Sequence, residues 1–175
     1  MITANRYHDI SVGHRVHGHE SKCRHLHGHN YRVHFHVAMD VEAKLVELND
    51  PEGLCHSEKE LALDSVGRVM DFSVIKEKLC MWLEDNWDHK FLAWEQDDFM
   101  HLIHDSYKGE SEDVIAADLM LSDSLVWTPF NPTAENMAEY LVQVIGPQQL
   151  AGTGVVLVKC TIEETMKCSV TYSKE

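Results

Sequence analysis

The amino-acid sequence predicts an α+β fold built on an antiparallel sheet. One long segment near the N-terminus alternates apolar and polar residues, as a half-buried strand does, and two shorter segments near the C-terminus also have strand character. Between them, two stretches repeat apolar residues at helical spacing. The predicted order is strand, strand, helix, helix, strand, strand, which is typical of the α+β class because the helices are grouped.

The clearest predicted strand runs from about residue 27 to residue 39. Arginine and histidine occupy its polar positions, and its apolar positions are Tyr31, Val33, Phe35 and Val37. A first strand is expected at residues 7–16, although Gly13 interrupts it, and a loop at 18–22 joins the two. These two strands would form an antiparallel pair.

Two helices are expected in the middle of the chain. Residues 66–71 are predicted to form a short strand that leads into the first helix, which Asp71 or Ser73 can cap. The apolar stripe of this helix is Ile75, Leu79, Trp82 and Leu83. The second helix is expected to begin at residues 131–136 and to end near Gly146-Pro147, with a stripe at Met137, Tyr140, Leu141 and Val144.

Two further strands, 154–163 and 168–173, close the chain. Residues 1–175 are expected to form one domain, since this length is enough for a single hydrophobic core. Two acidic regions, 40–65 and 97–123, show no clear period.

The charge balance narrows the possible partners. The chain has 15 basic and 29 acidic residues, and its net charge of −14 argues against binding to nucleic acids or anionic membranes, which require a basic surface. A local basic cluster could still bind a phosphorylated small molecule, and the candidates are Arg15, Lys22, Arg24 and Arg32. No segment reaches the roughly 20 apolar residues of a membrane span, and the first residues do not form a signal peptide. Five cysteines without a secreted context are typical of reduced thiols, so a cytoplasmic location is expected.

Histidine is concentrated at the N-terminus, where nine of the 13 histidines lie within the first 36 residues. Counting back in twos from Tyr31 places His29 and His27 on the apolar face of the strand, so their side chains project in parallel and can bind one metal ion. His14 is a third candidate ligand, although His17 or His19 could take its place. Three imidazoles suit Zn²⁺ and leave a fourth position open, which is typical of a catalytic site.

Two further groups have the chemistry of proton transfer. Cys23 lies just before the histidine pair, where a nearby Zn²⁺ and imidazole would lower the pKa of its thiol. The thiolate could be a general base or a fourth ligand, while a buried free cysteine is the simpler interpretation. Asp88 and His89 follow the first helix, and the carboxylate would orient the imidazole if His89 approaches Cys23.

Other polar residues have a structural interpretation beside a functional one. Thr133 and Glu135 fit a helix cap and an acid in the first turn. Glu163 and Glu164 end a strand, where either can be a solvated carboxylate. A buried glutamate, however, can bind a guanidine-like N–C–N edge through two parallel hydrogen bonds.

Six motifs follow one another in a specific order: Gly13-His14-Arg15, Cys23 to Tyr31, Met70-Asp71-Phe72, Trp87 to Leu92, Asn131 to Asn136, and Glu164-Thr165. Together they resemble the 6-pyruvoyltetrahydropterin synthase and 6-carboxytetrahydropterin synthase family of the tunnelling (T-fold) superfamily. The resemblance implies a four-stranded antiparallel sheet with two helices packed on one face, which assembles into an oligomeric barrel. Relative to compact family members, residues 40–65 and 97–123 are interpreted as insertions.

The resemblance also implies roles for single residues. The implied zinc ligands are His14, His27 and His29. The implied catalytic residues are Cys23, Asp88 and His89. The residues implied to bind the pterin, with Glu164 as its anchor, are Glu164, Thr133 and Glu135. Since the family builds its active sites between subunits of a homohexamer, the catalytic groups need not act within one chain.

The implied substrate is 7,8-dihydroneopterin triphosphate, and the favoured product is 6-carboxy-5,6,7,8-tetrahydropterin, formed with loss of acetaldehyde and triphosphate in the 7-deazaguanine and queuosine pathway. The runner-up is 6-pyruvoyltetrahydropterin, formed by triphosphate elimination with internal redox. A third branch makes a folate precursor and typically has glutamate near the catalytic cysteine's position; Cys23 argues against it, although Glu20 lies nearby. From another class, a non-catalytic histidine-rich metal-binding protein would use the same histidines and bind several ions.

Overall fold

The structure is a computed structural model that describes residues 1–49, 52, 56–106 and 123–174. Its centre is a six-stranded sheet with the order β4-β3-β1-β2-β5-β6. The strands are β1 (Ala4–His14), β2 (His27–Met39), β3 (Phe91–Trp94), β4 (Leu125–Thr128), β5 (Val155–Thr165) and β6 (Cys168–Ser173). The predicted α+β class is confirmed.

The four strands expected from the sequence form the antiparallel part of the sheet. β1 pairs with β2 along its whole length, β2 pairs with β5, and β5 pairs with β6. The expected number of strands was wrong, because β3 and β4 add two strands in parallel on the free edge of β1. Each has only four residues, which is too short to display an alternating pattern, and their pairing is decided by contacts with distant residues.

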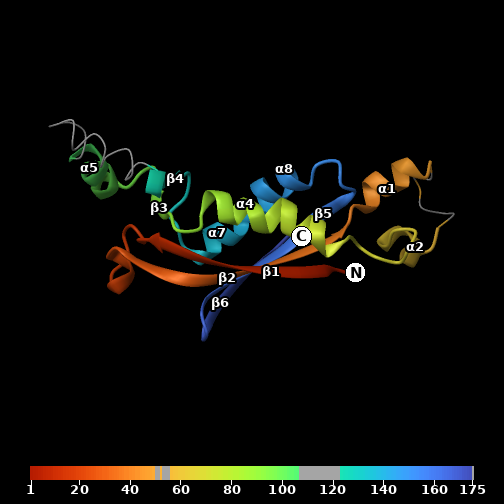
Figure 1. Ribbon diagram of the computed structural model, residues 1–175, viewed down its shortest axis with the longest axis horizontal. Coiled ribbons are helices and arrows are strands. Elements are labelled where there is room, and N and C mark those ends of the chain that lie inside the picture. Colours follow the sequence, from red (N-terminus) through yellow and green to blue (C-terminus); the bar gives the residue numbers. More distant parts are fainter. Residues whose placement is uncertain (50–51, 53–55, 107–122, 175) are drawn as a thin grey trace.

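Two long helical segments cover one face of the sheet, as Figure 1 shows. The first consists of α3 (Phe72–Ile75), a π-helical turn η2 (Lys76–Cys80) and α4 (Met81–Asn86). The second consists of α7 (Ala134–Tyr140), a π-helical turn η3 (Leu141–Ile145) and α8 (Gly146–Leu150). The expectation of two helices on one face is confirmed.

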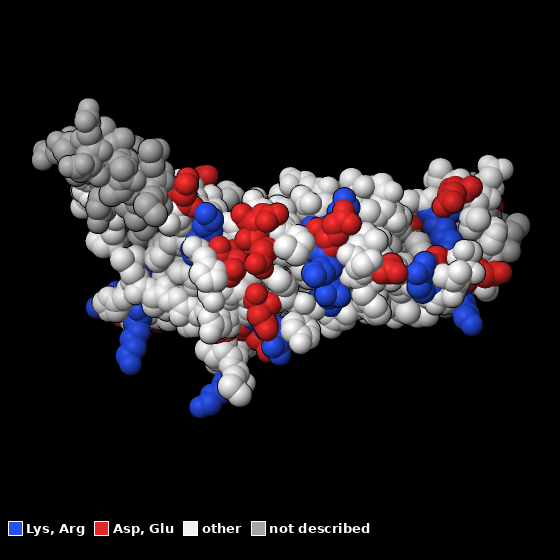
Figure 2. All heavy atoms as spheres, in the orientation of Figure 1, with Lys and Arg blue, Asp and Glu red and all other residues white. Residues whose placement is uncertain are grey.

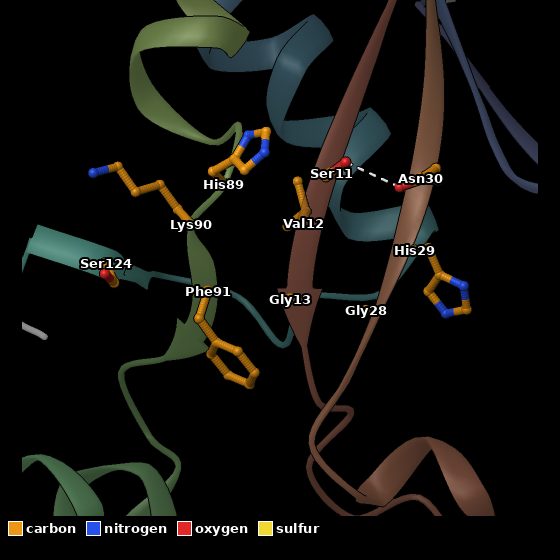
Figure 3. Close-up of a pocket in the computed structure, with 10 residues that line it drawn as sticks. All are labelled: Ser11, Val12, Gly13, Gly28, His29, Asn30, His89, Lys90, Phe91 and Ser124. Atoms are coloured by element: carbon orange, nitrogen blue, oxygen red, sulfur yellow. Dashed lines mark hydrogen bonds between the residues drawn. The ribbon is translucent and has the colours of Figure 1, made fainter.

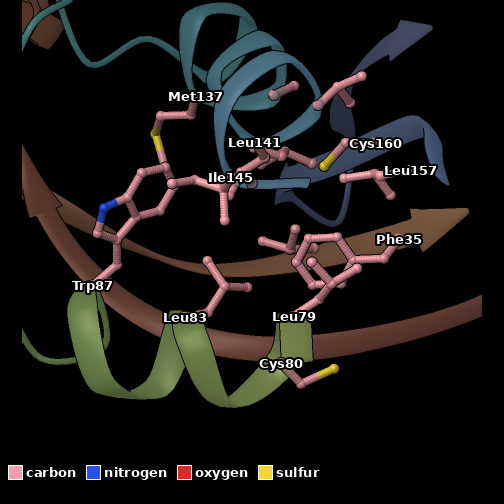
Figure 4. Packing of buried hydrophobic residues seen from close by; sticks show 14 of the residues in the cluster. Phe35, Leu79, Cys80, Leu83, Trp87, Met137, Leu141, Ile145, Leu157 and Cys160 are labelled. Atoms are coloured by element: carbon pink, nitrogen blue, oxygen red, sulfur yellow. The ribbon is translucent and has the colours of Figure 1, made fainter. Parts of the chain in front are cut away.

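The hydrophobic core lies between these helices and the sheet. Figure 4 shows Leu79 and Leu83 of the first helical segment, with Trp87 directly after it, facing Met137, Leu141 and Ile145 of the second segment. Phe35, Leu157 and Cys160 of the sheet lie beside these two groups. The buried residues Ile75, Leu79 and Leu83 belong to the apolar stripe that the sequence predicted, whereas Trp82 is only partly buried. Burial of this stripe holds the helix on the sheet.

The predicted strand at residues 66–71 was wrong, because this segment forms a turn. The Asp64 carboxylate accepts hydrogen bonds from the backbone N–H groups of Val66 and Arg68, at 3.0 and 2.8 Å. Those groups are therefore not available to a neighbouring strand. The helix after the turn begins as expected, with the Asp71 side chain accepting a hydrogen bond from the backbone N–H of Ser73.

The second helical segment does not stop near Gly146-Pro147 as expected but continues to Leu150. Pro147 lies in the first turn of α8, where a missing N–H is tolerated. Gly146 lets this turn approach β5, because a Cβ at this position would lie 2.8 Å from Cβ of Leu157. Both residues are thus compatible with a continued helix against the sheet.

Short helices occupy the described parts of the two acidic regions. They are α1 (Val41–Glu47), α2 (Glu58–Ala62) and α5 (Asp98–Ser106), and a short 3₁₀ turn η1 (Lys22–Arg24) lies between β1 and β2. Residues 107–122 lie outside the described part of the chain. That the two regions are insertions in a single domain stays a prediction.

The surface agrees with the composition in being rich in acidic groups. Acidic and basic side chains are interspersed over the face shown in Figure 2, so no single extended basic patch forms there. None of the helices among the described residues is long and apolar enough to cross a membrane. The cysteines in the described part of the chain, Cys23, Cys80, Cys160 and Cys168, are all free thiols.

Candidate functional site

Three histidines converge where β1 ends and β2 begins. His14 is the last residue of β1 and pairs in register with His27, the first residue of β2, while His29 follows two positions later on the same face. One nitrogen from each ring can be chosen so that all three lie within 4.8 Å of one another. In the described part of the chain, this is the one group of three such side chains close enough to hold a metal ion.

Backbone carbonyl groups fix the orientation of two of these rings. Nδ1 of His14 donates to the carbonyl oxygen of Pro132 at 2.7 Å, and Nδ1 of His27 donates to that of His25 at 2.7 Å. With Nδ1 protonated, the lone pair is on Nε2, which is the arrangement seen in metal-binding histidines. The geometry therefore prepares His14 and His27 to bind through Nε2.

Burial favours the neutral form of two of these imidazoles. It lowers the pKa of His14, an effect that the hydrogen bond to Pro132 only partly opposes, and it also lowers the pKa of His29. Neutral imidazole is the form that binds a metal ion. The site thus favours the protonation state that zinc requires.

Glu164 lies beside the cluster at the end of β5. Its Oε1 atom is 3.6 Å from Nε2 of His29 and 3.9 Å from Nε2 of His14. The neighbouring Glu163 instead bonds to His34 at 2.7 Å, on the other side of the strand. The sequence alone did not distinguish Glu163 from Glu164, and in the structure Glu164 is the one that lies beside the histidines.

A hydroxyl group lies between Glu164 and His14. The Tyr31 hydroxyl lies 3.0 Å from Nε2 of His14 and 3.3 Å from Oε1 of Glu164. Burial raises the pKa of this phenol above its ordinary value, and Glu164 and then Cys23 raise it further. The Tyr31 hydroxyl therefore remains protonated and is a hydrogen-bond donor at neutral pH. Sequence reasoning assigned Tyr31 only to the apolar face, although its position two residues after His29 was a usable signal.

Cys23 lies in η1, between the two strands that carry the histidines, and it is half-buried. Its carbonyl oxygen accepts a hydrogen bond from the backbone N–H of Val16 at 2.8 Å, which closes the loop between β1 and η1. Its thiol contributes to the raised pKa of Tyr31, after burial and Glu164.

Asp88 and His89 form a dyad on the other side of β1. Oδ2 of Asp88 accepts a hydrogen bond from Nδ1 of His89 at 2.7 Å, and Oδ1 accepts one from the backbone N–H of Ser11 at 2.7 Å. His89 has a φ of 56°, a left-handed conformation that is uncommon for residues other than glycine, and its N–H donates to the Ser11 carbonyl. The protein therefore holds an unfavourable backbone conformation at the residue after Asp88.

The hydrogen bonds of the dyad within the chain run to Ser11 of β1. The His89 side chain is 81% exposed and bonds to Asp88. Figure 3 shows His89 on one side of β1 and His29 on the other side, on β2. Both residues line a hollow of about 520 Å³, together with Lys90 and Phe91. An approach of His89 to Cys23 stays a prediction.

The remaining candidate residues have structural partners. Oγ1 of Thr133 caps α7 by accepting a hydrogen bond from the backbone N–H of Asn136, and Glu135 is exposed in the first turn. His17 lies 3.5 Å from Asp97, and His19 accepts a hydrogen bond from the Ser21 N–H, so neither joins the cluster. The roles of Thr133 and Glu135 toward a substrate stay predictions.

Residues 3–175 match the protein family described as 6-pyruvoyl tetrahydropterin synthase. The chain belongs to this family. A 6-carboxy-5,6,7,8-tetrahydropterin synthase from Rickettsia felis is 26% identical over 170 residues, which cover 97% of this chain and 99% of the relative. The similarity therefore extends over the whole chain and includes both acidic regions.

Solved structures show the same fold. An uncharacterized protein from Wolinella succinogenes superimposes with a TM-score of 0.72 at 23% identity, covering 99% of this chain and 98% of that one. The 6-pyruvoyl tetrahydropterin synthase of Caenorhabditis elegans superimposes with a TM-score of 0.56 at 21% identity, covering 99% of this chain and 96% of that one. The T-fold expected for a pterin synthase is confirmed.

Proposed function

We propose that this pterin synthase converts 7,8-dihydroneopterin triphosphate to 6-carboxy-5,6,7,8-tetrahydropterin, with loss of acetaldehyde and triphosphate, in the 7-deazaguanine and queuosine pathway. The observation that carries the proposal is the histidine cluster His14, His27 and His29 with Glu164 beside it. The name of the Rickettsia felis relative supports the carboxy product. By its chemistry the enzyme would be a lyase.

The cluster fits Zn²⁺ as its cofactor. The three side chains are nitrogen ligands whose pKa values, where shifted, favour the neutral form, and two of the rings are oriented by backbone carbonyls. When bound, zinc would polarise the hydroxyl groups of the substrate side chain and lower their pKa values. Tyr31 and Glu164 lie beside the cluster.

Glu164 would bind the pterin ring. A carboxylate can accept two parallel hydrogen bonds from the N–C–N edge of the ring, which fixes the side chain of the substrate toward the histidines. The hydrogen bond from Tyr31 to Oε1 of Glu164 would orient the carboxylate for this contact. Thr133 and Glu135 would lie at the border of the ring site.

Cys23 and His89 would move protons on the substrate side chain, with Asp88 orienting the imidazole of His89. We propose that Cys23 of one subunit and the dyad of a neighbour complete the site in a homohexamer, since the hydrogen bonds of the dyad within its own chain run to Ser11 of β1. The reduced thiols are consistent with action in the cytoplasm.

The runner-up reaction forms 6-pyruvoyltetrahydropterin at the same site, and the family description supports it. A metal-binding protein without catalysis would also use the three histidines, but it requires neither Glu164 nor Cys23. Product analysis separates all three functions.

The test is incubation of the zinc-loaded protein with 7,8-dihydroneopterin triphosphate and identification of products by mass spectrometry. We expect a carboxylated tetrahydropterin and acetaldehyde from the unaltered protein. Glu164→Ala should abolish turnover and leave bound zinc unchanged, whereas the matched control Glu163→Ala should remain active because Glu163 bonds to His34 on the other side of the strand. A pyruvoyl product would favour the runner-up, and unchanged substrate with several zinc ions per chain would favour metal binding.

A further inference from the structure

A buried carboxylate contacts the residue that follows the candidate ligand His14, and it has no role in the function proposed above. Asp97 precedes α5, and its side chain is only 1% exposed. Its Oδ2 atom is 2.8 Å from Nε of Arg15, whose side chain is 14% exposed. Arg15 directly follows the candidate ligand His14, so Asp97 contacts the chain where it leaves the histidine cluster.

Asp97 also contacts the next part of the same loop. Its Oδ1 atom lies 3.5 Å from Nδ1 of His17 and accepts a hydrogen bond from the backbone N–H of Phe99 at 3.1 Å. The Phe99 ring covers the Arg15 guanidinium, with 4.7 Å between Cζ and the ring centroid. One carboxylate therefore joins residues 15–17 to the beginning of α5.

The loop held in this way leads to Cys23. The backbone N–H of Val16 donates to the Cys23 carbonyl at 2.8 Å, and the Asn131 side chain bonds both the N–H and the carbonyl of His17 at 2.9 Å. Phe99 borders a hollow together with residues after Cys23, namely Arg24, His25 and Leu26. The beginning of α5 thus contacts one end of the loop that carries the candidate catalytic thiol, and it lines a hollow with the other end.

The contact between Asp97 and Arg15 is electrostatic. Nε of Arg15 and Oδ2 of Asp97 are close but poorly aligned, and neither atom has a hydrogen-bond partner. A buried charge that loses its counter-charge is strongly disfavoured, so removal of one partner should make the other move toward water. Such a movement would displace the loop.

We propose that Asp97 is a positioning residue: through Arg15 and His17 it holds the loop that carries Cys23 in place beside the histidine cluster. The proposal rests on the proposed function, in which Cys23 moves protons. It also gives the beginning of the acidic region 97–123 a part in catalysis, because the region meets the active-site loop through its first residue.

The test compares Asp97→Asn, which removes the charge at constant size, with Asp98→Asn, an equally conservative change at the next, exposed residue. Zinc content, kcat and KM are measured on each holoenzyme, and alkylation of each cysteine by iodoacetamide is followed by mass spectrometry. Exposed Cys168 is the internal reference.

For Asp97→Asn we expect kcat to fall by about tenfold or more, since small displacements of catalytic groups have effects of this size, while KM changes by less than about twofold. Zinc content should stay constant, and the alkylation rate of Cys23 should change relative to that of Cys168. Asp97→Glu should restore part of kcat and part of the wild-type alkylation rate of Cys23. Asp98→Asn should change neither kcat nor this alkylation rate.

Unchanged kcat and unchanged Cys23 alkylation in Asp97→Asn, with only a lower Tm, would show a purely structural ion pair and overturn the proposal. If Asp97→Asn does not fold, Asp97→Glu and Arg15→Lys are judged by the same two readouts. Alkylation requires no turnover, so an inactive wild-type protein would contradict the proposed function and still leave the positioning of Cys23 tested.

Discussion

The ring of His14 and the carbonyl group of Pro132 are joined by a hydrogen bond of 2.7 Å across 118 positions of sequence. This bond connects the end of β1 with the beginning of α7, and it orients His14 toward His27 and His29. The candidate metal site is therefore a product of both halves of the chain, although all three imidazoles come from the first 29 residues.

Replacement of His14 should remove the metal. We expect His14→Ala to lower zinc content from about one ion per chain to near zero, because two imidazoles bind zinc much more weakly than three. His19→Ala is the matched control, since His19 bonds to Ser21 outside the cluster. Metal analysis by inductively coupled plasma mass spectrometry decides, and zinc retained in His14→Ala but lost in His19→Ala would reverse the assignment.

Removal of zinc should destabilise the folded protein. A ligand that binds only the native state at 100 times its Kd adds about 2.7 kcal/mol to the free energy of unfolding. We expect the Tm to fall after treatment with a chelator and to recover on addition of Zn²⁺ but not of Mg²⁺, which prefers oxygen ligands. The same Tm with and without zinc would argue against a zinc site in the folded protein.

Asp88→Asn should reduce activity far more than it reduces stability. Asparagine can still accept the hydrogen bond from the Ser11 N–H, but it would not stabilise an imidazolium at His89. We expect kcat to fall by about 10²-fold, in the range of general acid–base effects. Glu84→Gln, which alters an exposed pair with His8, is the control and should keep its activity.

The Asp88 carboxyl should also make stability depend on pH. Burial opposes its ionisation, but hydrogen bonds from the Ser11 N–H and from His89 together hold its pKa below the ordinary value. A folded-state pKa below the unfolded value near 4 means that this stabilisation is complete above pH 4 and is lost as the pH falls through the folded-state pKa. Urea unfolding of wild type and Asp88→Asn should therefore differ most at neutral pH and converge in acid; a constant difference would contradict this cause.

Gly28→Ala should disturb both the strand pair and the metal site. A Cβ at Gly28 would lie 2.9 Å from the carbonyl oxygen of Val12, which is backbone and cannot rotate away. We expect a loss of about 1–3 kcal/mol in the free energy of unfolding, as for other overpacked sites, together with weaker zinc binding by the flanking His27 and His29. Asn5→Ala, at an exposed position of β1, should change neither quantity.

Local patterns predicted the parts of the fold that repeat along the chain. The alternation around Tyr31 and Val33 predicted β2 with its observed bounds, and the helix stripe predicted the burial of Leu79 and Leu83. The turn at Asp64 was missed because side-chain hydrogen bonds replaced the backbone pairing expected for residues 66–71. Short β3 and β4 were missed because four residues show no period.

The sequence by itself determined the α+β class and the strand face on which His27 and His29 lie, because strand and helix periods depend only on neighbouring residues. The tertiary structure alone decided that His14 rather than His17 or His19 joins them, that Glu164 rather than Glu163 lies beside them, and that the Asp88–His89 pair is bonded to β1. These choices depend on strand register and on contacts such as that of Pro132 with His14, which join residues far apart in the chain and leave no periodic signal.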